Sequence, residues 1–333
     1  MDKHRPNYHF MPPANWMNDP NGLIQWNGTY HLFYQHNPAS AGWGSMHWGH
    51  ATSQDLVHWQ HLPIALAPTP DGPDHTGVWS GCMVDWNRVP TAVYTARDGE
   101  REHVSLASSH DNFLTWEKFS GNPVIVDPPA GLDLVAFRDP CVWRVDGGWK
   151  MVIGSGIRGV GGAILLYSSA NLTDWHFLGP LVVGDATQKE PLWAGEMWEC
   201  PNFFPLGDRH ILMISAMAVN PTGQGLYSMY MAGKFSDNHF TPEVAAKLDG
   251  GDIFFYAPQA FQDERGRRIA FGWSQEARSL EVQRTAGWAG VMTLPRLLEW
   301  RSDGWMGQRP VPEVELLRGT EQHWPRFSVA PGQ

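Results

Sequence analysis

The chain has 333 residues, of which 42% are hydrophobic and 17% are charged. This composition excludes an intrinsically disordered protein and predicts one or two folded domains. The net charge is −10, and no run of Lys or Arg forms a basic strip, which argues against a nucleic-acid partner because phosphate binding needs concentrated positive charge. A neutral small molecule such as a sugar is compatible with this charge balance.

The cysteines and the N-terminal residues bear on the cellular compartment. Cys82, Cys141 and Cys200 are odd in number and widely spaced, so they indicate neither a disulfide framework nor a zinc site. The first six residues are polar and charged and lack the apolar core of a secretory signal, and no apolar stretch approaches the ~18 residues of a membrane span. We therefore expect a cytoplasmic protein with no membrane partner.

Taken in chain order, five short segments have the features of buried strands, because they are rich in β-branched or aromatic residues and are bounded by Gly, Asn, Asp or Pro. They are residues 30–35, 91–96, 149–154, 210–215 and 268–273. Successive segments begin 61, 58, 61 and 58 residues apart. Five similar units, all strand and turn, predict an all-β protein with the fold of a five-bladed β-propeller. The alternative is an irregular β-sandwich in which this spacing is accidental.

A second repeat accompanies the first in three of the units. Residues 53–59, 109–116 and 169–175 each begin with Ser and end with Trp, which predicts a strand that ends in a turn closed by the Trp. The repeats account for the chain to about residue 300. We assign residues 1–307 to the propeller, with a funnel at its centre, and residues 308–333 to a C-terminal tail packed on it.

Three carboxylates occupy the same position in different units. Asp19, Asp139 and Glu199 lie 11, 10 and 11 residues before the start of a repeated strand, and each is followed by Pro directly or one residue later. In the other two units the equivalent positions hold Ser80 and Tyr256. If the segment before each repeated strand is the innermost strand of its blade, all five side chains converge on the propeller axis.

Converging carboxylates are typical of glycoside hydrolysis, in which one acts as nucleophile or base and another as acid. Their mutual repulsion is expected to raise one pKa, and the neighbouring Arg138 is expected to keep Asp139 ionised. A purely structural turn and a calcium site stay open as alternatives, because an Asp-Pro pair is a common turn signal by itself and carboxylates also bind calcium. No run of Asp at alternating positions supports a calcium site, and the 15 histidines show no metal-ligand spacing, so we assign no metal.

Aromatic and amide residues complete the predicted site. Trp43, Trp48 and Trp79 lie in Gly-rich segments rather than in the middle of strands, which favours an exposed face, although packing between blades is an equal alternative. Gln35 ends a repeated strand, where it could bind a hydroxyl group or cap the blade.

These motifs together closely resemble glycoside hydrolase family 32, the invertases and fructan hydrolases. The motif around Asp19 looks like the nucleophile motif of that family, and the others follow it in the family's order. The matching segments are residues 15–22, 33–38, 48–53, 79–81, 137–140, 198–201, 256–259 and 287–290. The resemblance extends from residue 9 to about residue 317.

The resemblance implies a role for each carboxylate and no cofactor. Asp19 would attack the anomeric carbon of a β-linked fructofuranosyl unit, and Glu199 would protonate the leaving oxygen and then activate water. Asp139, with Arg138, would hold the ring hydroxyls and stabilise the transition state. Retention of configuration fits carboxyl groups that are about 5–5.5 Å apart. The residues that the resemblance places in the fructose pocket are Asn18, Gln35, Trp43, Trp79, Ser80, Tyr256 and Trp273.

The chain departs from the family pattern in two ways. Cys82 stands where the family usually has Ser, which is expected to alter the packing under the pocket. Family members normally carry a C-terminal β-sandwich, and this chain stops where that domain would begin. We therefore expect another surface, such as a second subunit of a homo-oligomer, to cover the exposed flank of the propeller.

Other functions share the same scaffold. A fructosyltransferase would use the same intermediate with a different acceptor, and a related propeller furanosidase would act on arabinose. A catalytically silent sugar-binding propeller is the alternative outside enzymes. The presence of all three carboxylates argues against it, because a binding protein has no need of an acid such as Glu199.

Overall fold

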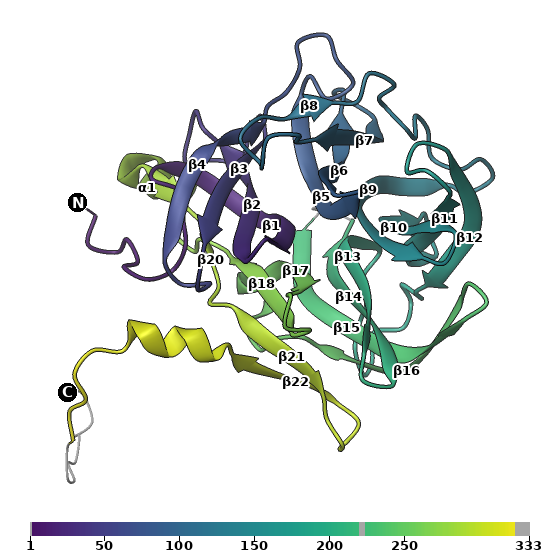
Figure 1. The fold of residues 1–333 in the computed structure, drawn as a ribbon. Coiled ribbons are helices and arrows are strands. Elements are labelled where there is room, and N and C mark those ends of the chain that lie inside the picture. The colour runs from purple at the N-terminus through teal and green to yellow at the C-terminus, as the bar shows by residue number, and fades with distance from the viewer. Residues whose placement is uncertain (1, 220–223, 324–333) are drawn as a thin grey trace.

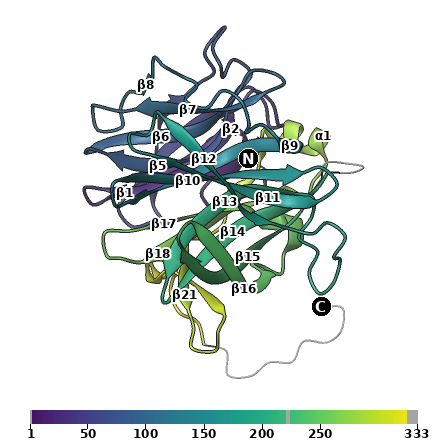
Figure 2. The ribbon, with the colours of Figure 1, turned by 90° about the vertical axis from the view of Figure 1, so that its right-hand side faces the viewer.

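A computed structural model describes residues 2–219 and 224–323 of the chain. Five β-sheets stand round one axis in the order of the sequence (Figure 1). Figure 2 shows the ring from its side, with the strands of the second sheet above those of the fourth. The predicted five-bladed β-propeller is therefore confirmed.

Each sheet forms one blade. Blade one contains β1 (Asn15–Trp26), β2 (Thr29–Asn37), β3 (His47–Ser53), β4 (Trp59–Leu66) and β19 (Trp288–Ala289), and blade two contains β5 (Gly77–Trp86), β6 (Val89–Arg97), β7 (Glu102–Ser108) and β8 (Glu117–Lys118). Blade three contains β9 (Leu134–Val145), β10 (Gly148–Ile157), β11 (Gly161–Ser169) and β12 (Trp175–Val183), and blade four contains β13 (Met197–Leu206), β14 (Arg209–Ala218), β15 (Gln224–Ser236) and β16 (His239–Lys247). Blade five contains β17 (Tyr256–Gln262), β18 (Arg268–Ser274), β20 (Val291–Met292), β21 (Arg296–Trp300) and β22 (Met306–Pro310).

The five repeated segments are β2, β6, β10, β14 and β18, the second strand of each blade. The strand before each of them, namely β1, β5, β9, β13 or β17, lies nearest the centre in Figure 1. As predicted, the innermost strand of each blade comes immediately before the repeated strand. The residues that precede the repeated strands therefore lie at the centre of the propeller.

Apolar side chains fill the space between every pair of neighbouring blades. Alternate residues of a strand point to opposite faces of its sheet, so one strand serves two clusters. In β10, Met151 and Ile153 pack between blades two and three, whereas Val152 packs between blades three and four. All three side chains are fully buried. The repeated strands are therefore apolar on both faces, which explains why they stood out in the sequence.

The ring is closed by a parallel pairing between two segments that are distant in sequence. Asn15 and Trp16 of β1 pair with Trp288 and Ala289 of β19. His9 Nδ1 also lies 2.8 Å from the Met292 carbonyl oxygen, across 283 positions of the sequence. The N-terminal part of the chain, including β1, is thus held by residues that follow β18 in the sequence.

The predicted turn closed by the Trp is found in the first and third Ser-to-Trp segments, whereas in the second the buried Trp116 indole nitrogen has no hydrogen-bond partner among the described residues. In the first, Asp55 Oδ1 accepts hydrogen bonds from the backbone nitrogens of Val57 and His58, and the Trp59 indole donates to the Leu56 carbonyl oxygen at 3.1 Å. Trp175 makes the equivalent bond to Leu172 at 2.7 Å in blade three.

Three short helices were not predicted. They are η1 (Asp252–Phe254), α1 (Leu280–Ala286) and η2 (Pro312–Leu317). Ser279 caps the N-terminus of α1 by accepting a bond from the Val282 nitrogen, and Gly287, in the left-handed conformation at φ 75°, ends it. No helix in the described part of the chain is long and apolar enough to cross a membrane.

The expected boundary between residues 307 and 308 falls inside β22, because residues 308–310 pair with β21 and complete blade five. The described tail then packs on the propeller through the buried Val311 and the ion pair of Glu313 with Arg267 at 2.9 Å. Residues 324–333 of the predicted tail lie outside the described residues.

Candidate active site

Each of the five innermost strands contributes one residue to the same end of the propeller axis: Asp19, Ser80, Asp139, Glu199 and Tyr256. Each strand also has a break in its pairing register beside that residue. Such a bulge turns a side chain out of the regular alternation. In three of the five strands a proline lies unpaired within the break, which suits a residue with no N–H to donate, and in β1 Pro20 is the paired residue that ends the break. The Pro residues seen in the sequence therefore re-aim these side chains toward the axis.

The site is a cavity of about 230 Å³, equal to the volume of about eight water molecules in the liquid at about 30 Å³ each. This size suits a small polar ligand such as one sugar ring. The cavity is lined by Asn18, Asp19, Gln35, Trp43, Trp79, Ser80, Arg138, Asp139, Glu199 and Met217. Nine of these ten residues were predicted to form the site.

Three donors surround the Asp19 carboxylate. Ser80 Oγ donates to Oδ2 at 2.6 Å, Asn18 Nδ2 donates to Oδ1 at 3.0 Å, and the Cys200 thiol lies 3.5 Å from Oδ2. Burial raises the pKa of Asp19 and the charge of Glu199 adds to this rise, while the hydrogen bonds lower it. The carboxylate is thus held in one orientation, with its charge stabilised by donors rather than by water.

Glu199 is held by an arginine and a tyrosine. Its Oε1 accepts hydrogen bonds from Arg138 Nε at 3.1 Å and Nη2 at 2.9 Å, and its Oε2 accepts one from the Tyr256 hydroxyl at 2.7 Å. Arg138 Nη1 in turn donates to Glu102 Oε1 at 2.7 Å. Glu102, from β7 of the neighbouring blade, therefore fixes the arginine that fixes Glu199.

This arrangement corrects one expectation from the sequence. Arg138 was expected to keep the adjacent Asp139 ionised, but its guanidinium is engaged by Glu102 and Glu199. The Asp139 carboxylate instead accepts from the Cys200 backbone nitrogen at 2.9 Å and lies 3.5 Å from the Cys200 thiol. Burial raises the pKa of Asp139, and the opposing effect of the Arg138 charge is too small to reverse this. Asp139 lies in the register break of β9, with a φ of 63°.

The predicted aromatic residues are divided between the site and the core. Trp43 is 60% exposed and packs edge-on against Trp79, with ring centroids 5.8 Å apart, at the mouth of the cavity. Trp48 is fully buried between blades one and two, so for this residue the alternative of packing between blades is correct and the exposed face is not. Trp273 does not line the cavity but packs behind it, against a cluster that contains Tyr256. Tyr256 reaches the site through its hydroxyl group.

Gln35 is buried at the floor of the site, where its side-chain nitrogen donates to the Val78 carbonyl oxygen at 3.1 Å. Four further residues take part that sequence reasoning had not assigned: Thr95, Glu102, Cys200 and Met217. Thr95 accepts from the Asp139 backbone nitrogen at 2.8 Å. Cys200 could have been noticed, since it lies in the same motif as Glu199, and Thr95, since it lies in the repeated segment 91–96. Glu102 and Met217 lie outside the repeated segments, on β7 and at the end of β14.

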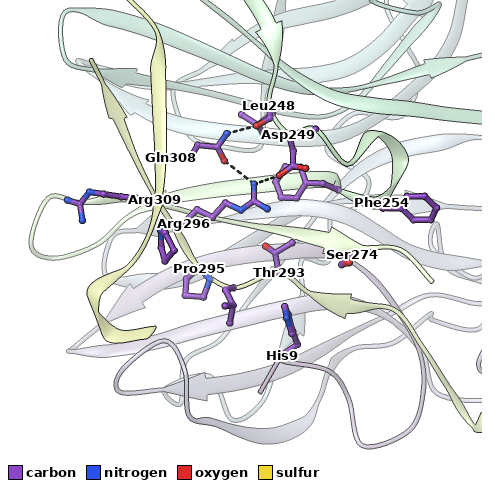
Figure 3. A pocket seen from close by; sticks show the side chains of 14 residues that line it. His9, Leu248, Asp249, Phe254, Ser274, Thr293, Pro295, Arg296, Gln308 and Arg309 are labelled. Atoms are coloured by element: carbon purple, nitrogen blue, oxygen red, sulfur yellow. Dashed lines mark hydrogen bonds and ion pairs between the residues drawn. The ribbon is translucent and has the colours of Figure 1, made fainter. Parts of the chain in front are cut away.

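A larger cavity, of about 660 Å³, lies elsewhere, beside blade five (Figure 3). Both of its arginines already have partners: Arg296 lies between Asp249 at 2.6 Å and Gln308 at 3.2 Å, and Arg309 lies 3.8 Å from Glu299. The small axial cavity is the better candidate because three carboxylates meet there. Within residues 2–219 and 224–323, no group of three or more His, Cys, Asp or Glu side chains is arranged to hold a metal ion.

Comparison with known proteins gives concordant matches. The family described as glycosyl hydrolases family 32, N-terminal domain, matches residues 9–310. Two Escherichia coli relatives, a sucrose-6-phosphate hydrolase and a raffinose invertase, are 44% and 43% identical over 96% and 94% of this chain. The chain spans 66% of the length of each of them. Among solved structures, fructan 1-exohydrolase IIa from Cichorium intybus superposes with a TM-score of 0.83 at 33% identity, covering 96% of this chain and 63% of that one.

Proposed function

Since the chain belongs to glycosyl hydrolase family 32, we propose that it is a retaining β-fructofuranosidase acting on sucrose and short fructo-oligosaccharides. The observation that supports this most directly is the meeting of three carboxylates from three innermost strands around one cavity the size of a sugar ring. A double displacement needs one ionised carboxylate and one that can give and take a proton. Ser80 and Asn18 donate hydrogen bonds to Asp19, which favours its ionised form, and the Tyr256 hydroxyl donates to Glu199.

In the first step, an Asp19 carboxylate oxygen attacks the anomeric carbon of the fructosyl unit. The bond from that carbon to the leaving oxygen breaks, and Glu199 gives its proton to that oxygen. Ser80 and Asn18 hold the attacking group in place, so little orientation freedom is lost at the moment of reaction. The product is a fructosyl ester of Asp19 and a free sugar with a new hydroxyl group.

In the second step, Glu199 takes a proton from water, and the water oxygen attacks the same carbon as the bond to Asp19 breaks. Two inversions give net retention. In this proposal Asp139 accepts hydrogen bonds from ring hydroxyls and Gln35 binds a further hydroxyl, which their position in the lining of the cavity supports. Trp43 and Trp79 provide an aromatic surface at the mouth for the leaving sugar.

The decisive assay measures fructose release from a panel of substrates. The relatives are named for sucrose 6-phosphate and raffinose, so these join sucrose, kestose, inulin and levan in the panel. Release from at least one is expected, and failure with all of them would leave the sugar-binding alternative. Fructose transferred to a second sugar at high sucrose would instead identify a fructosyltransferase.

Reaction in the presence of methanol tests the stereochemistry, because free fructose loses its anomeric configuration too quickly to be assigned. Retention is expected to give methyl β-D-fructofuranoside, detectable by NMR, whereas the α-anomer would contradict the double displacement.

Asp19→Asn and Glu199→Gln are expected to lower kcat at least ~10³-fold while circular dichroism stays unchanged. In the Glu199→Gln variant, added azide is expected to restore turnover of an activated fructoside, with a fructosyl azide as product.

A further inference from the structure

The propeller axis has a second cavity, at the end opposite the carboxylates. It measures about 560 Å³ and receives residues from all five innermost strands. On each of these strands, the residues that line this rear cavity come after the residue that the strand contributes to the active site. On β9, Cys141–Val145 follow Asp139, and on β17 residues 259–262 follow Tyr256. Because a strand rises about 3.3 Å per residue, the two cavities open toward opposite faces of the ring.

A layer of two side-chain amides separates the cavities. Gln259 accepts from the Leu23 backbone nitrogen at 3.0 Å and donates to the Gly81 carbonyl oxygen at 2.8 Å. Asn202 accepts from the Ala260 nitrogen at 2.8 Å. Both amides bind backbone groups of other blades, so they are fixed in place at the inner end of the rear cavity, which they also line.

The lining of the rear cavity is mainly apolar, with three side-chain amides and three basic residues from different blades. Arg268, His210 and Arg144 line it together with aromatic side chains, among them Phe203 and Phe261, and no Asp or Glu is among the lining residues. Arg268 is half-buried, and its guanidinium lies 4.5 Å from the centre of the Phe204 ring. Within the described residues it has no ion pair and no side-chain hydrogen bond.

This lack of a partner sets Arg268 apart from comparable arginines. Of the seven other half-buried arginines among the described residues, six are paired with a carboxylate and one, Arg5, donates to the Pro12 carbonyl oxygen at 2.7 Å. The six are Arg97, Arg138, Arg209, Arg267, Arg278 and Arg296. A guanidinium offers five donors, and burying them without acceptors is costly. Burial lowers the pKa of Arg268 to about 10, so it still carries its charge near neutral pH. An anionic ligand would supply the counter-charge that Arg268 lacks.

We propose that the rear cavity binds a small organic anion, whose carboxylate or phosphate group pairs with Arg268 while its apolar body packs against the phenylalanine rings. The volume lies within the range of small-molecule sites, and the combination of an aromatic wall with few polar groups is typical of them. The exposed Arg144, whose guanidinium lies 5.1 Å from the centre of the Trp149 ring, also lines the cavity and adds weaker attraction for the same charge.

Benzoate and phenyl phosphate are suitable probes, with benzamide as the neutral counterpart of benzoate and inorganic phosphate as the head group alone. Titration calorimetry and ligand-observed NMR on the whole chain are expected to show one saturable site for each aromatic anion at millimolar concentration. Benzamide and inorganic phosphate are expected to bind at least ~10-fold more weakly, because each lacks one of the two contacts. Whichever aromatic anion binds more tightly identifies the preferred head group.

Arg268→Gln is expected to weaken benzoate binding at least ~10-fold, and Arg268→Lys less. Arg88→Gln is the matched control, since Arg88 is an exposed arginine in the turn after β5, outside the cavity. If Arg268→Gln does not fold, Arg144→Gln serves instead, with a loss of about threefold expected for an exposed charge. The proposal would be overturned if benzamide bound as tightly as benzoate, or if the Arg268 variants bound benzoate as tightly as the wild type. Displacement of benzoate by fructose would also overturn it, because the anion would then bind among the carboxylates of the active site.

Discussion

At the scale of single residues, the contact between Ser80 and Asp19 governs the charge of the proposed nucleophile. The hydroxyl group donates to Oδ2 at 2.6 Å and lowers a pKa that burial raises. Attack requires the ionised carboxylate, so activity is lost as the pH falls through the pKa of Asp19, which lies above the ordinary value of about 4.

Ser80→Ala removes this donor and should raise the pKa of Asp19 further. A hydrogen bond to a charged group contributes about 1.5–3 kcal/mol, so the acid limb of the kcat/KM profile is expected to move up by about one to two pH units. The test is a pH profile of both proteins with sucrose. Ser80→Thr, which keeps a hydroxyl group, should restore the position of the limb, and an acid limb that stays in place in Ser80→Ala would show that Asp19 does not set it.

At the scale of elements, the approach of β1 to the segment after β19 depends on a glycine. Gly290 has a φ of 80°, and a Cβ atom added there would lie 2.1 Å from the Met17 carbonyl oxygen. A residue with a side chain at position 290 would therefore have to displace β1, the strand that carries Asp19.

Gly290→Ala is therefore expected to lower the free energy of unfolding by roughly 3 kcal/mol or more, through clash and backbone strain together. The matched control is Gly304→Ala, at φ 84° with no atom within 4 Å of the added Cβ, which should cost only about 1–2 kcal/mol for the left-handed conformation. Urea unfolding of both variants measures the difference. Equal losses would mean that the close approach to Met17 contributes nothing.

The elements also show what could be read from the sequence and what could not. The repeated strands and the common position of Asp19, Asp139 and Glu199 were predictable, because periodic burial and proline placement are local properties. The partner of Arg138 was not, because Glu102 reaches it from another blade, 36 positions away. Trp48 likewise looked exposed beside its glycines, but neighbouring blades decide its burial.

At the scale of the whole molecule, two histidines sit in the packing between blades. His31 and His50 are buried, lie 3.0 Å apart between Nδ1 and Nε2, and stack on Phe113 and Phe33. Burial lowers the pKa of His31 to about 4 and that of His50 to about 3. In the unfolded chain both would bind a proton below about pH 6.5. Unfolding therefore takes up protons between about pH 6.5 and pH 4, and stability is lost as the pH falls through this range.

The double variant His31→Leu/His50→Leu should lose this dependence. Each histidine adds up to about 1.4 kcal/mol per pH unit to the slope of the unfolding free energy against pH. Between pH 6 and 4.5 the free energy of unfolding of the variant is therefore expected to fall less steeply than that of the wild type, whatever its value at pH 7. Denaturant unfolding across that range provides the comparison, with the exposed His239→Leu as control. Parallel slopes in wild type and double variant would assign the acid sensitivity to other groups.

The parallel pairing of β1 with β19 also has a consequence for how the chain is made. Residues 15 and 16 are synthesised early, but their partners at 288 and 289 emerge only after four blades and much of the fifth. Until then β1 has an open edge, with backbone groups able to pair with a strand of another chain. Contacts between such distant residues also form slowly. Ribosomes that stall in the last blade would thus release chains prone to aggregation, and efficient production depends on the final segment arriving promptly.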